Sequence, residues 1–132
     1  DNAFLVHNGG KCGMTDITGK IVIPVKYDKI KKWDDNRYMI ELGGKSGFVT
    51  KNGVEIAPLI FEYIGPERSI ASTGETRICV KSNGKYGFLD YNLKIAIPCV
   101  YDFALDFANG KSLVSGDDNS WYIDKDAKVV KY

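Results

Sequence analysis

Side chains that could act in catalysis or metal binding are few in this sequence. His7 is the one histidine, and it lies beside the turn signal Asn8-Gly9-Gly10. A general base or a metal ligand needs partner side chains close by, and the pattern of the chain places none near His7. We therefore interpret His7 as an ordinary surface histidine.

The three cysteines, Cys12, Cys79 and Cys99, are odd in number and widely spaced. This pattern fits neither a disulfide framework nor a zinc site, for which paired cysteines at short spacings are typical. The sequence also contains no nucleophile elbow, phosphate-binding loop or paired-cysteine motif. We expect small apolar cysteines, no cofactor, no metal ion and no enzymatic activity.

Acidic residues recur in two series along the chain. The first series is Asp16, Asp90 and Asp124, and the second is Asp28, Glu62 and Asp102. Paired carboxylates can serve as acid and base, and a ladder of carboxylates can hold calcium. An aspartate in a turn also accepts hydrogen bonds from nearby backbone N–H groups, so it recurs wherever the turn recurs. We favour the turn interpretation for both series.

The densest basic cluster lies beside Trp33 and comprises Lys26, Lys29, Lys31 and Lys32. Basic residues next to an aromatic ring are typical of single-strand nucleic-acid binding. Acidic residues interrupt this cluster, however, at Asp28, Asp34 and Asp35. Eighteen basic against seventeen acidic side chains leave a formal net charge of +1, which gives no field that would attract nucleic acid. We predict a solvated connector of mixed charge and no nucleic-acid partner.

The composition indicates what kind of elements carry these side chains. Of the 132 residues, 44% are hydrophobic and 12% aromatic, and the chain contains eight Tyr and fourteen Gly. Such a composition favours one globular domain rich in strands and turns. No apolar stretch approaches the roughly 18 residues that a membrane span needs. No signal-peptide pattern is visible.

The chain contains an internal repeat, which we anchor on Gly13, Gly47, Gly87 and, in a fourth copy, Trp121. Each anchor glycine has a lysine two residues before it, a proline eleven after, an aromatic residue fourteen after and an acid fifteen after. The anchors are 34, 40 and 34 residues apart, so the second copy carries six extra residues, between positions 65 and 76. We predict a single domain, 1–132, with repeats near 4–37, 38–77, 78–111 and, in part, 112–132.

Each repeat is predicted to be a three-stranded antiparallel meander. A short apolar strand and a tight turn such as Asn83-Gly84 come first. The second strand crosses the anchor, where we expect a backbone or an aromatic ring to pass too close for a side chain. A second turn leads to a third strand, which the proline is expected to end. The predicted fold is all-β, with meanders of about 34 residues stacked in a solenoid-like or propeller-like array.

The pattern Gly-aromatic-x-Asp-x-x-Gly-x-x-Ile-Pro-x-x-Tyr-Asp resembles the WG (KWG) β-repeat of bacterial proteins. Residues 13–28 and 87–102 match it best, and with the degraded copies the resemblance covers essentially the whole chain. The naming tryptophan is replaced by Cys12, Ser46, Tyr86 and Ser120, and Leu93 replaces a turn glycine. The resemblance implies a repeat scaffold that binds other molecules, by analogy at the level of fold. Localisation stays open: we favour the bacterial cytoplasm slightly, and an exported or surface form is the alternative if a leader was removed, because the chain begins at Asp1 without Met.

Loops that depart from the repeat are the predicted partner-binding surface, because loops on a rigid scaffold are frequent binding sites. The candidates are Glu67, Arg68 and Ser69 in the inserted loop, Asp117 and Asp118 in an acidic turn, and Trp33. For the ring of Trp33 we favour packing between repeats over exposure to a partner.

Two classes of function fit this pattern. The first is a non-enzymatic protein-binding scaffold, of which a bacterial immunity protein that masks the active site of a toxin is a specific form. The second is a module for carbohydrate or cell-wall glycan, in which exposed aromatic faces would be supplied by Tyr27, Trp33, Tyr101 or Trp121.

Overall fold

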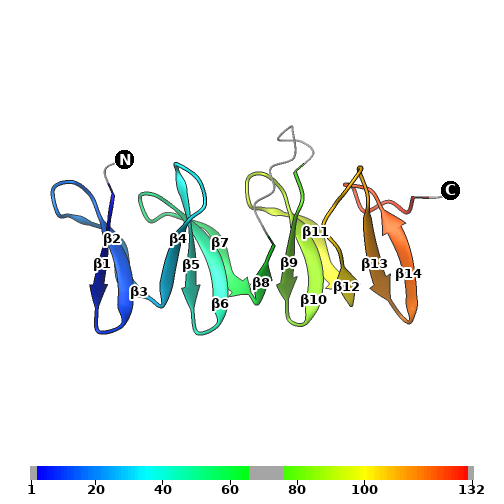
Figure 1. The fold of residues 1–132 in the computed structure, drawn as a ribbon, viewed down its shortest axis with the longest axis horizontal. Coiled ribbons are helices and arrows are strands. Elements are labelled where there is room, and N and C mark those ends of the chain that lie inside the picture. The colour runs from blue at the N-terminus through cyan, green and yellow to red at the C-terminus, as the bar shows by residue number, and fades with distance from the viewer. Residues whose placement is uncertain (1–2, 66–75, 131–132) are drawn as a thin grey trace. The chain divides into compact units, whose positions relative to one another are not determined.

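The fold is all-β, as the sequence predicts (Figure 1). The structure is a computed structural model that describes residues 3–65 and 76–130. Contacts divide the chain into two compact units, residues 1–60 and 61–132. The described residues contain no helix with the length and apolar character that a membrane crossing requires.

The first unit contains two antiparallel sheets. One has the order β1-β2-β3 and the other β4-β5-β6-β7. Their strands are β1 (Phe4–Asn8), β2 (Lys11–Thr15), β3 (Ile21–Tyr27), β4 (Lys29–Lys32), β5 (Arg37–Leu42), β6 (Lys45–Thr50) and β7 (Glu55–Phe61), the last of which reaches the boundary between the units. Met14, Ile23 and Tyr27 from the first sheet and Tyr38, Ile40 and Val49 from the second form one buried cluster.

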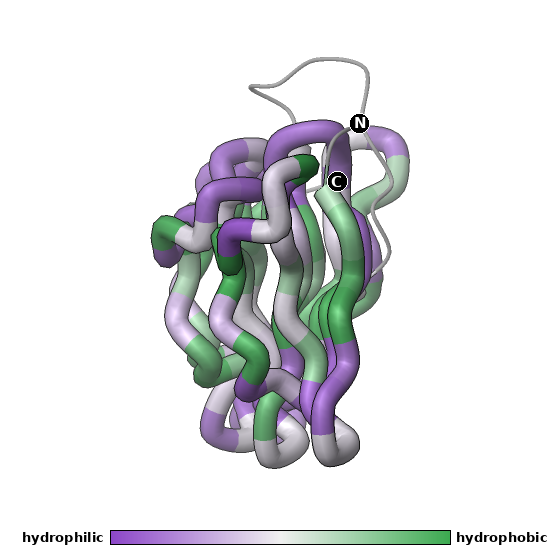
Figure 2. The backbone as a smooth tube through the Cα atoms, turned by 90° about the vertical axis from the view of Figure 1, so that its left-hand side faces the viewer, coloured by the Kyte–Doolittle hydropathy of each residue, from purple (hydrophilic) through white to green (hydrophobic). Residues whose placement is uncertain are grey.

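The second unit also contains two antiparallel sheets, with the orders β11-β10-β9-β8 and β12-β13-β14. Their strands are β8 (Tyr63–Ile64), β9 (Ile78–Ser82), β10 (Lys85–Leu89), β11 (Ile95–Tyr101), β12 (Phe103–Ala104), β13 (Ser112–Gly116) and β14 (Asn119–Ile123). The shared core comprises Cys79, Phe88, Ile97, Ala104, Val114 and Ile123. Figure 2 shows hydrophilic residues concentrated in the turns, while the strands carry most of the hydrophobic ones.

The predicted tight turns are present. Asn83-Gly84 joins β9 to β10, and Asp117-Asp118 joins β13 to β14, each with two consecutive positive φ angles. Two such residues form the hairpin turn whose twist matches that of the flanking strands. Leu93, which replaces a turn glycine, has a φ of 63° and is fully buried.

The third strand in each of the first three meanders continues through its proline, which corrects the prediction that proline ends the strand. β3 contains Pro24, β7 contains Pro58 and β11 contains Pro98. Cys12 pairs with Tyr27 whereas Met14 pairs with Ile23, so β3 advances four residues while β2 advances two. A bulge of this kind interrupts the hydrogen-bond ladder, and proline, which has no N–H, is tolerated there.

The bulge explains the anchor glycines. A Cβ on Gly13 would lie 2.6 Å from the carbonyl oxygen of Ile23, and one on Gly87 would lie 2.5 Å from that of Ile97. The expectation that a backbone crosses close over each glycine is confirmed. In the described part of the fourth copy the position of β3 is reduced to an isolated bridge between Ile123 and Val129. Trp121, in the anchor position, contacts the ring of Tyr101 at 6.2 Å between centroids.

A short strand precedes the second, third and fourth meanders and was not predicted. These strands, β4, β8 and β12, follow the corner acid of the preceding repeat and pair with the first strand of the next. The sequence pattern there is short and polar or mixed, so it carries too little alternation to indicate a strand. Each of these strands is an edge strand in the sheet of the next meander.

Candidate functional site

The first series of recurring acids stabilises turns. In Asp16, Asp90 and Asp124 the Oδ1 atom accepts hydrogen bonds from the backbone N–H groups two and four residues later, at 2.9 to 3.1 Å. The Thr18 hydroxyl, which also donates to Asp16, is the largest cause of a lowered pKa of that carboxyl. The bond from the Lys128 N–H is the largest cause of a lowered pKa of Asp124. The turn interpretation is confirmed for this series.

The second series connects one repeat to the next hairpin turn. Asp28 forms an ion pair with Lys11 and accepts a hydrogen bond from the N–H of Gly43 at 2.9 Å. Asp102 pairs in the same way with Lys85. Each lysine is the largest cause of the lowered pKa of its partner carboxyl. Glu62 accepts a hydrogen bond from the N–H of Gly84 at 3.0 Å. These acids therefore hold successive hairpins in place.

The remaining candidates for chemistry do not form a reactive cluster. Among residues 3–65 and 76–130, no group of three His, Cys, Asp or Glu side chains could hold a metal ion. His7 is exposed, and its Nδ1 lies 3.6 Å from the Sγ of Cys12. Burial is the largest cause that raises the pKa of the Cys79 thiol to about 12, which keeps it protonated and unreactive at neutral pH.

Three lysines of the basic cluster, Lys29, Lys31 and Lys32, are exposed on strand β4, whereas Lys26 lies on β3. Lys32 pairs with Asp35 at 3.2 Å. Trp33, directly after this strand, is 9% exposed and contacts Phe48 edge to face at 5.0 Å between centroids. Trp33 belongs to the first repeat and Phe48 to the second, so packing between repeats is confirmed for this ring. Its burial argues against Trp33 as a partner-binding residue.

The other predicted partner-binding residues divide into two groups. Asp117 and Asp118 are exposed at the turn between β13 and β14. Glu67, Arg68 and Ser69 lie outside the described residues.

The rings named for glycan binding do not form an exposed platform. Tyr27 is 6% exposed, and Trp33 is buried against Phe48. Tyr101 and Trp121 are partly buried and contact each other edge to face. A glycan module built on these four residues is therefore not supported.

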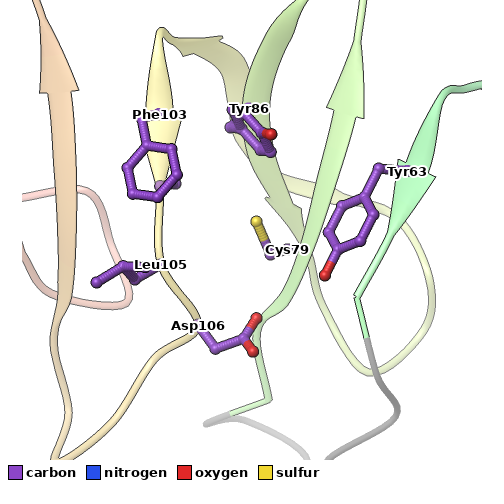
Figure 3. Close-up of a pocket in the computed structure, with 7 residues that line it drawn as sticks. Tyr63, Cys79, Tyr86, Phe103, Leu105 and Asp106 are labelled. Atoms are coloured by element: carbon purple, nitrogen blue, oxygen red, sulfur yellow. The ribbon is translucent and has the colours of Figure 1, made fainter.

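A pocket of about 220 Å³ opens in the second unit and was not predicted. It is lined by Tyr63 of β8, Cys79 of β9, Tyr86 of β10, Phe103 and Ala104 of β12, and the next two residues, Leu105 and Asp106. Figure 3 shows the rings of Phe103, Tyr86 and Tyr63 around the Cys79 thiol, with the Asp106 carboxylate on the side away from Tyr86.

The aromatic walls of this pocket contact one another edge to face. The centroids of Tyr63 and Tyr86 are 6.5 Å apart, and those of Tyr86 and Phe103 are 5.9 Å apart. Tyr63 and Phe103 remain 45% and 46% exposed, and Leu105 is similarly open to solvent. Edge-to-face pairs fix ring positions, so this pocket offers a preformed apolar wall.

Asp106 gives the pocket its charge. Among the described residues that line the pocket, it is the one with a charged side chain. Partial burial and then the negative charge of Asp106 raise the pKa of Tyr63 above its ordinary value. The carboxylate of Asp106 therefore acts electrostatically on the aromatic wall opposite to it.

The sequence matches a protein family described as WG containing repeat over residues 13–45 and 86–121, slightly more than half of the chain. The chain belongs to the WG containing repeat family. A search among curated proteins and a search among solved structures each found no match.

The pocket is specific to one pair of WG repeats. Sixteen, eighteen and nineteen residues after Gly87 lie Phe103, Leu105 and Asp106, whereas the same offsets from Gly13 hold Lys29, Lys31 and Lys32. The residue before the anchor glycine is Tyr86 in the third repeat but Cys12 in the first. The scaffold is therefore repeated while the pocket chemistry is not.

This difference between copies is the signal by which the pocket could have been found from the sequence. The pattern of the repeat ends at the corner acid Asp102, so it predicts no site at Phe103 to Asp106. At equal offsets, the first copy has three lysines where the third has an aromatic, an aliphatic and an acidic residue.

Proposed function

We propose that this protein is a non-enzymatic protein-binding module and that the pocket of the second unit is the centre of its binding surface. The observation that carries this proposal is an exposed aromatic pocket at positions where another repeat of the same chain has lysines. Packing of the repeat does not require aromatic residues there, because the first unit forms its core without them.

The composition of the pocket supports a protein partner. Tyrosine and other aromatic residues are enriched at the centres of protein interfaces, and they account for much of the binding energy when a partner covers them. Tyr63, Phe103 and Leu105 leave apolar surface in water in the free protein, and a partner would bury it. An immunity protein that covers the active site of a toxin is the narrower form of this proposal.

The test is affinity capture with matched variants. The protein is immobilised and exposed to a lysate of its source organism, and captured proteins are compared between the wild type and Phe103→Lys. We expect Phe103→Lys to lose a partner, because it places in the pocket the residue type found at the same offset in the first repeat. Ile95→Lys is the control, since Ile95 is 51% exposed on β11 and does not line the pocket.

The outcomes distinguish specific binding at the pocket from non-specific binding to exposed apolar residues of the sheets. Loss of the same protein with Phe103→Lys and its retention with Ile95→Lys support the proposal. A partner that both variants retain would place the binding surface elsewhere. Circular dichroism of each variant establishes that it is folded before capture is compared.

A further inference from the structure

The carboxylate of Asp106 differs from those of the aspartates that recur in the two series of the repeat. Asp16, Asp28 and Asp124 each accept backbone hydrogen bonds. In the described part of the chain, Asp106 has neither a hydrogen bond nor an ion pair, although it lines a pocket. An exposed carboxylate beside aromatic rings can pair with a cation that also donates hydrogen bonds, and such charge-assisted bonds are stronger than neutral ones.

The aromatic walls favour the same charge. The face of an aromatic ring attracts cations through its quadrupole. The ring of Tyr86 already has one such contact, because the Nζ of Lys81 lies 5.3 Å from its centroid. Lys81 does not line the pocket, and Asp106 supplies the charge among the described residues that do.

We propose that this pocket takes the side chain of an arginine presented by the partner protein. The guanidinium would pair with the Asp106 carboxylate, and its stem and planar face would lie against Tyr63 and Phe103. This inference rests on the proposed protein-binding function and names the group that the pocket recognises.

Arginine fits better than the two nearest alternatives. A guanidinium is planar, stacks on aromatic rings, binds a carboxylate through two hydrogen bonds and is more weakly hydrated than the lysine ammonium. A neutral sugar would need several fixed donors and acceptors. The described lining offers few such groups, namely the Asp106 carboxylate and the hydroxyls of Tyr63 and Tyr86 beside the Cys79 thiol.

A small probe tests the inference without knowledge of the partner. Nα-acetyl-arginine-N-methylamide is titrated into the ¹⁵N-labelled full chain, and amide shifts are followed by NMR. We expect saturable shifts at Tyr63, Cys79 and the amides of residues 103–106, with millimolar affinity. The citrulline analogue has nearly the same shape without the charge, and we expect it to bind at least about fivefold more weakly.

Variants assign the effect to the pocket residues. Asp106→Asn should weaken arginine binding about fivefold, since it removes the charge and keeps the size of the side chain. Phe103→Lys should abolish the shifts. Asp118→Asn is the matched control, because it removes one negative charge at an exposed turn and should leave the affinity unchanged.

Each outcome decides the inference. Equal binding of the arginine and citrulline probes, or no effect of Asp106→Asn, overturns it. Shifts of the same amides with an N-acetylglucosamine trimer but not with arginine also overturn it, in favour of a glycan. If the arginine probe does not bind but Phe103→Lys still loses the captured partner, the protein-binding function is supported and the assignment of arginine is wrong. If the arginine probe binds but Phe103→Lys captures the same partner as the wild type, the pocket is not the surface that binds the partner.

Discussion

Tyr86 occupies the position directly before the anchor glycine, which the family fills with the tryptophan of its name. The other repeats have Cys12, Ser46 and Ser120 at this position. The third repeat thus keeps an aromatic ring where the others have small side chains, and this ring contacts both Tyr63 and Phe103. One retained aromatic position is therefore the wall on which the pocket is built.

Asp106 and Tyr63 should show their interaction in the ionisation of the tyrosine. Partial burial and the charge of Asp106 both raise the pKa of Tyr63, so Asp106→Asn should lower this pKa toward its ordinary value of 10.0 while burial keeps it above that value. The measurement is an NMR pH titration of the ¹³C-labelled tyrosine ring. Asp118→Asn serves as the control and should leave the pKa of Tyr63 unchanged. An unchanged Tyr63 pKa in Asp106→Asn would mean that the two groups are farther apart in solution.

At the scale of strands and turns, much of the fold follows from local chemistry. Glycine and asparagine pairs predict the tight turns, and the three anchor glycines predict a close backbone, because these residues satisfy local geometric demands. The continuation of β3 through Pro24 could not be predicted in this way. Proline is compatible with both a strand end and a bulge, and the choice depends on pairing with β2.

The anchor glycines provide a test of the bulge. Gly87→Ala would place a Cβ 2.5 Å from the carbonyl oxygen of Ile97 and 2.7 Å from the nitrogen of Cys99, and both are backbone atoms that cannot turn aside. We expect a loss of about 3 kcal/mol in the free energy of unfolding, measured with urea. Gly116→Ala is the matched control, since its Cβ would meet the Trp121 ring at an ordinary 3.6 Å. Equal free energies of unfolding for the two variants would contradict the close approach of the β11 backbone to Gly87.

The candidate site is much less predictable from the sequence than the strands are. Tyr63, Cys79 and Phe103 are far apart along the chain, and they meet because β8 pairs with β9 and β12 pairs with β13 in the adjacent sheet. The pairing of these two-residue strands is set by the next repeat and leaves no periodic pattern of its own. Predictions based on loops instead selected residues 67–69, which the structure does not describe, and the acidic turn.

At the scale of the whole molecule, the two units share a framework of acids and lysines but differ in their surfaces. The pairs Lys11–Asp28 and Lys85–Asp102 occupy equivalent places in the first and second units. Each pair lies beside a segment that carries lysines in one unit and the aromatic pocket in the other. A repeated framework with one altered surface is what a binding scaffold requires, because stability and recognition then depend on different residues.

The shared framework predicts how stability depends on pH. The pKa of Asp28 is lowered mainly by Lys11, and that of Asp102 mainly by Lys85. A carboxyl group with a lowered pKa in the folded state stabilises the protein above its unfolded pKa, with an ordinary value of 3.8, and this stabilisation is lost as the pH falls through the lower folded value. We therefore expect both units to lose stability below about pH 4.

Each unit contains one of the two tryptophans, Trp33 and Trp121, so fluorescence can follow each unit separately. In a Trp121→Phe background, Trp33 fluorescence reports the urea unfolding of the first unit. There, Asp28→Asn should lower the free energy of unfolding at pH 7. It should also make that free energy depend less on pH between 5 and 2. In a Trp33→Phe background, Trp121 reports the second unit, and Asp102→Asn should lower its free energy of unfolding and flatten its pH dependence in the same way. Both effects should shrink in high salt because these ion pairs are partly exposed. Acid profiles that neither substitution flattens would show that the Lys–Asp pairs do not stabilise the repeats.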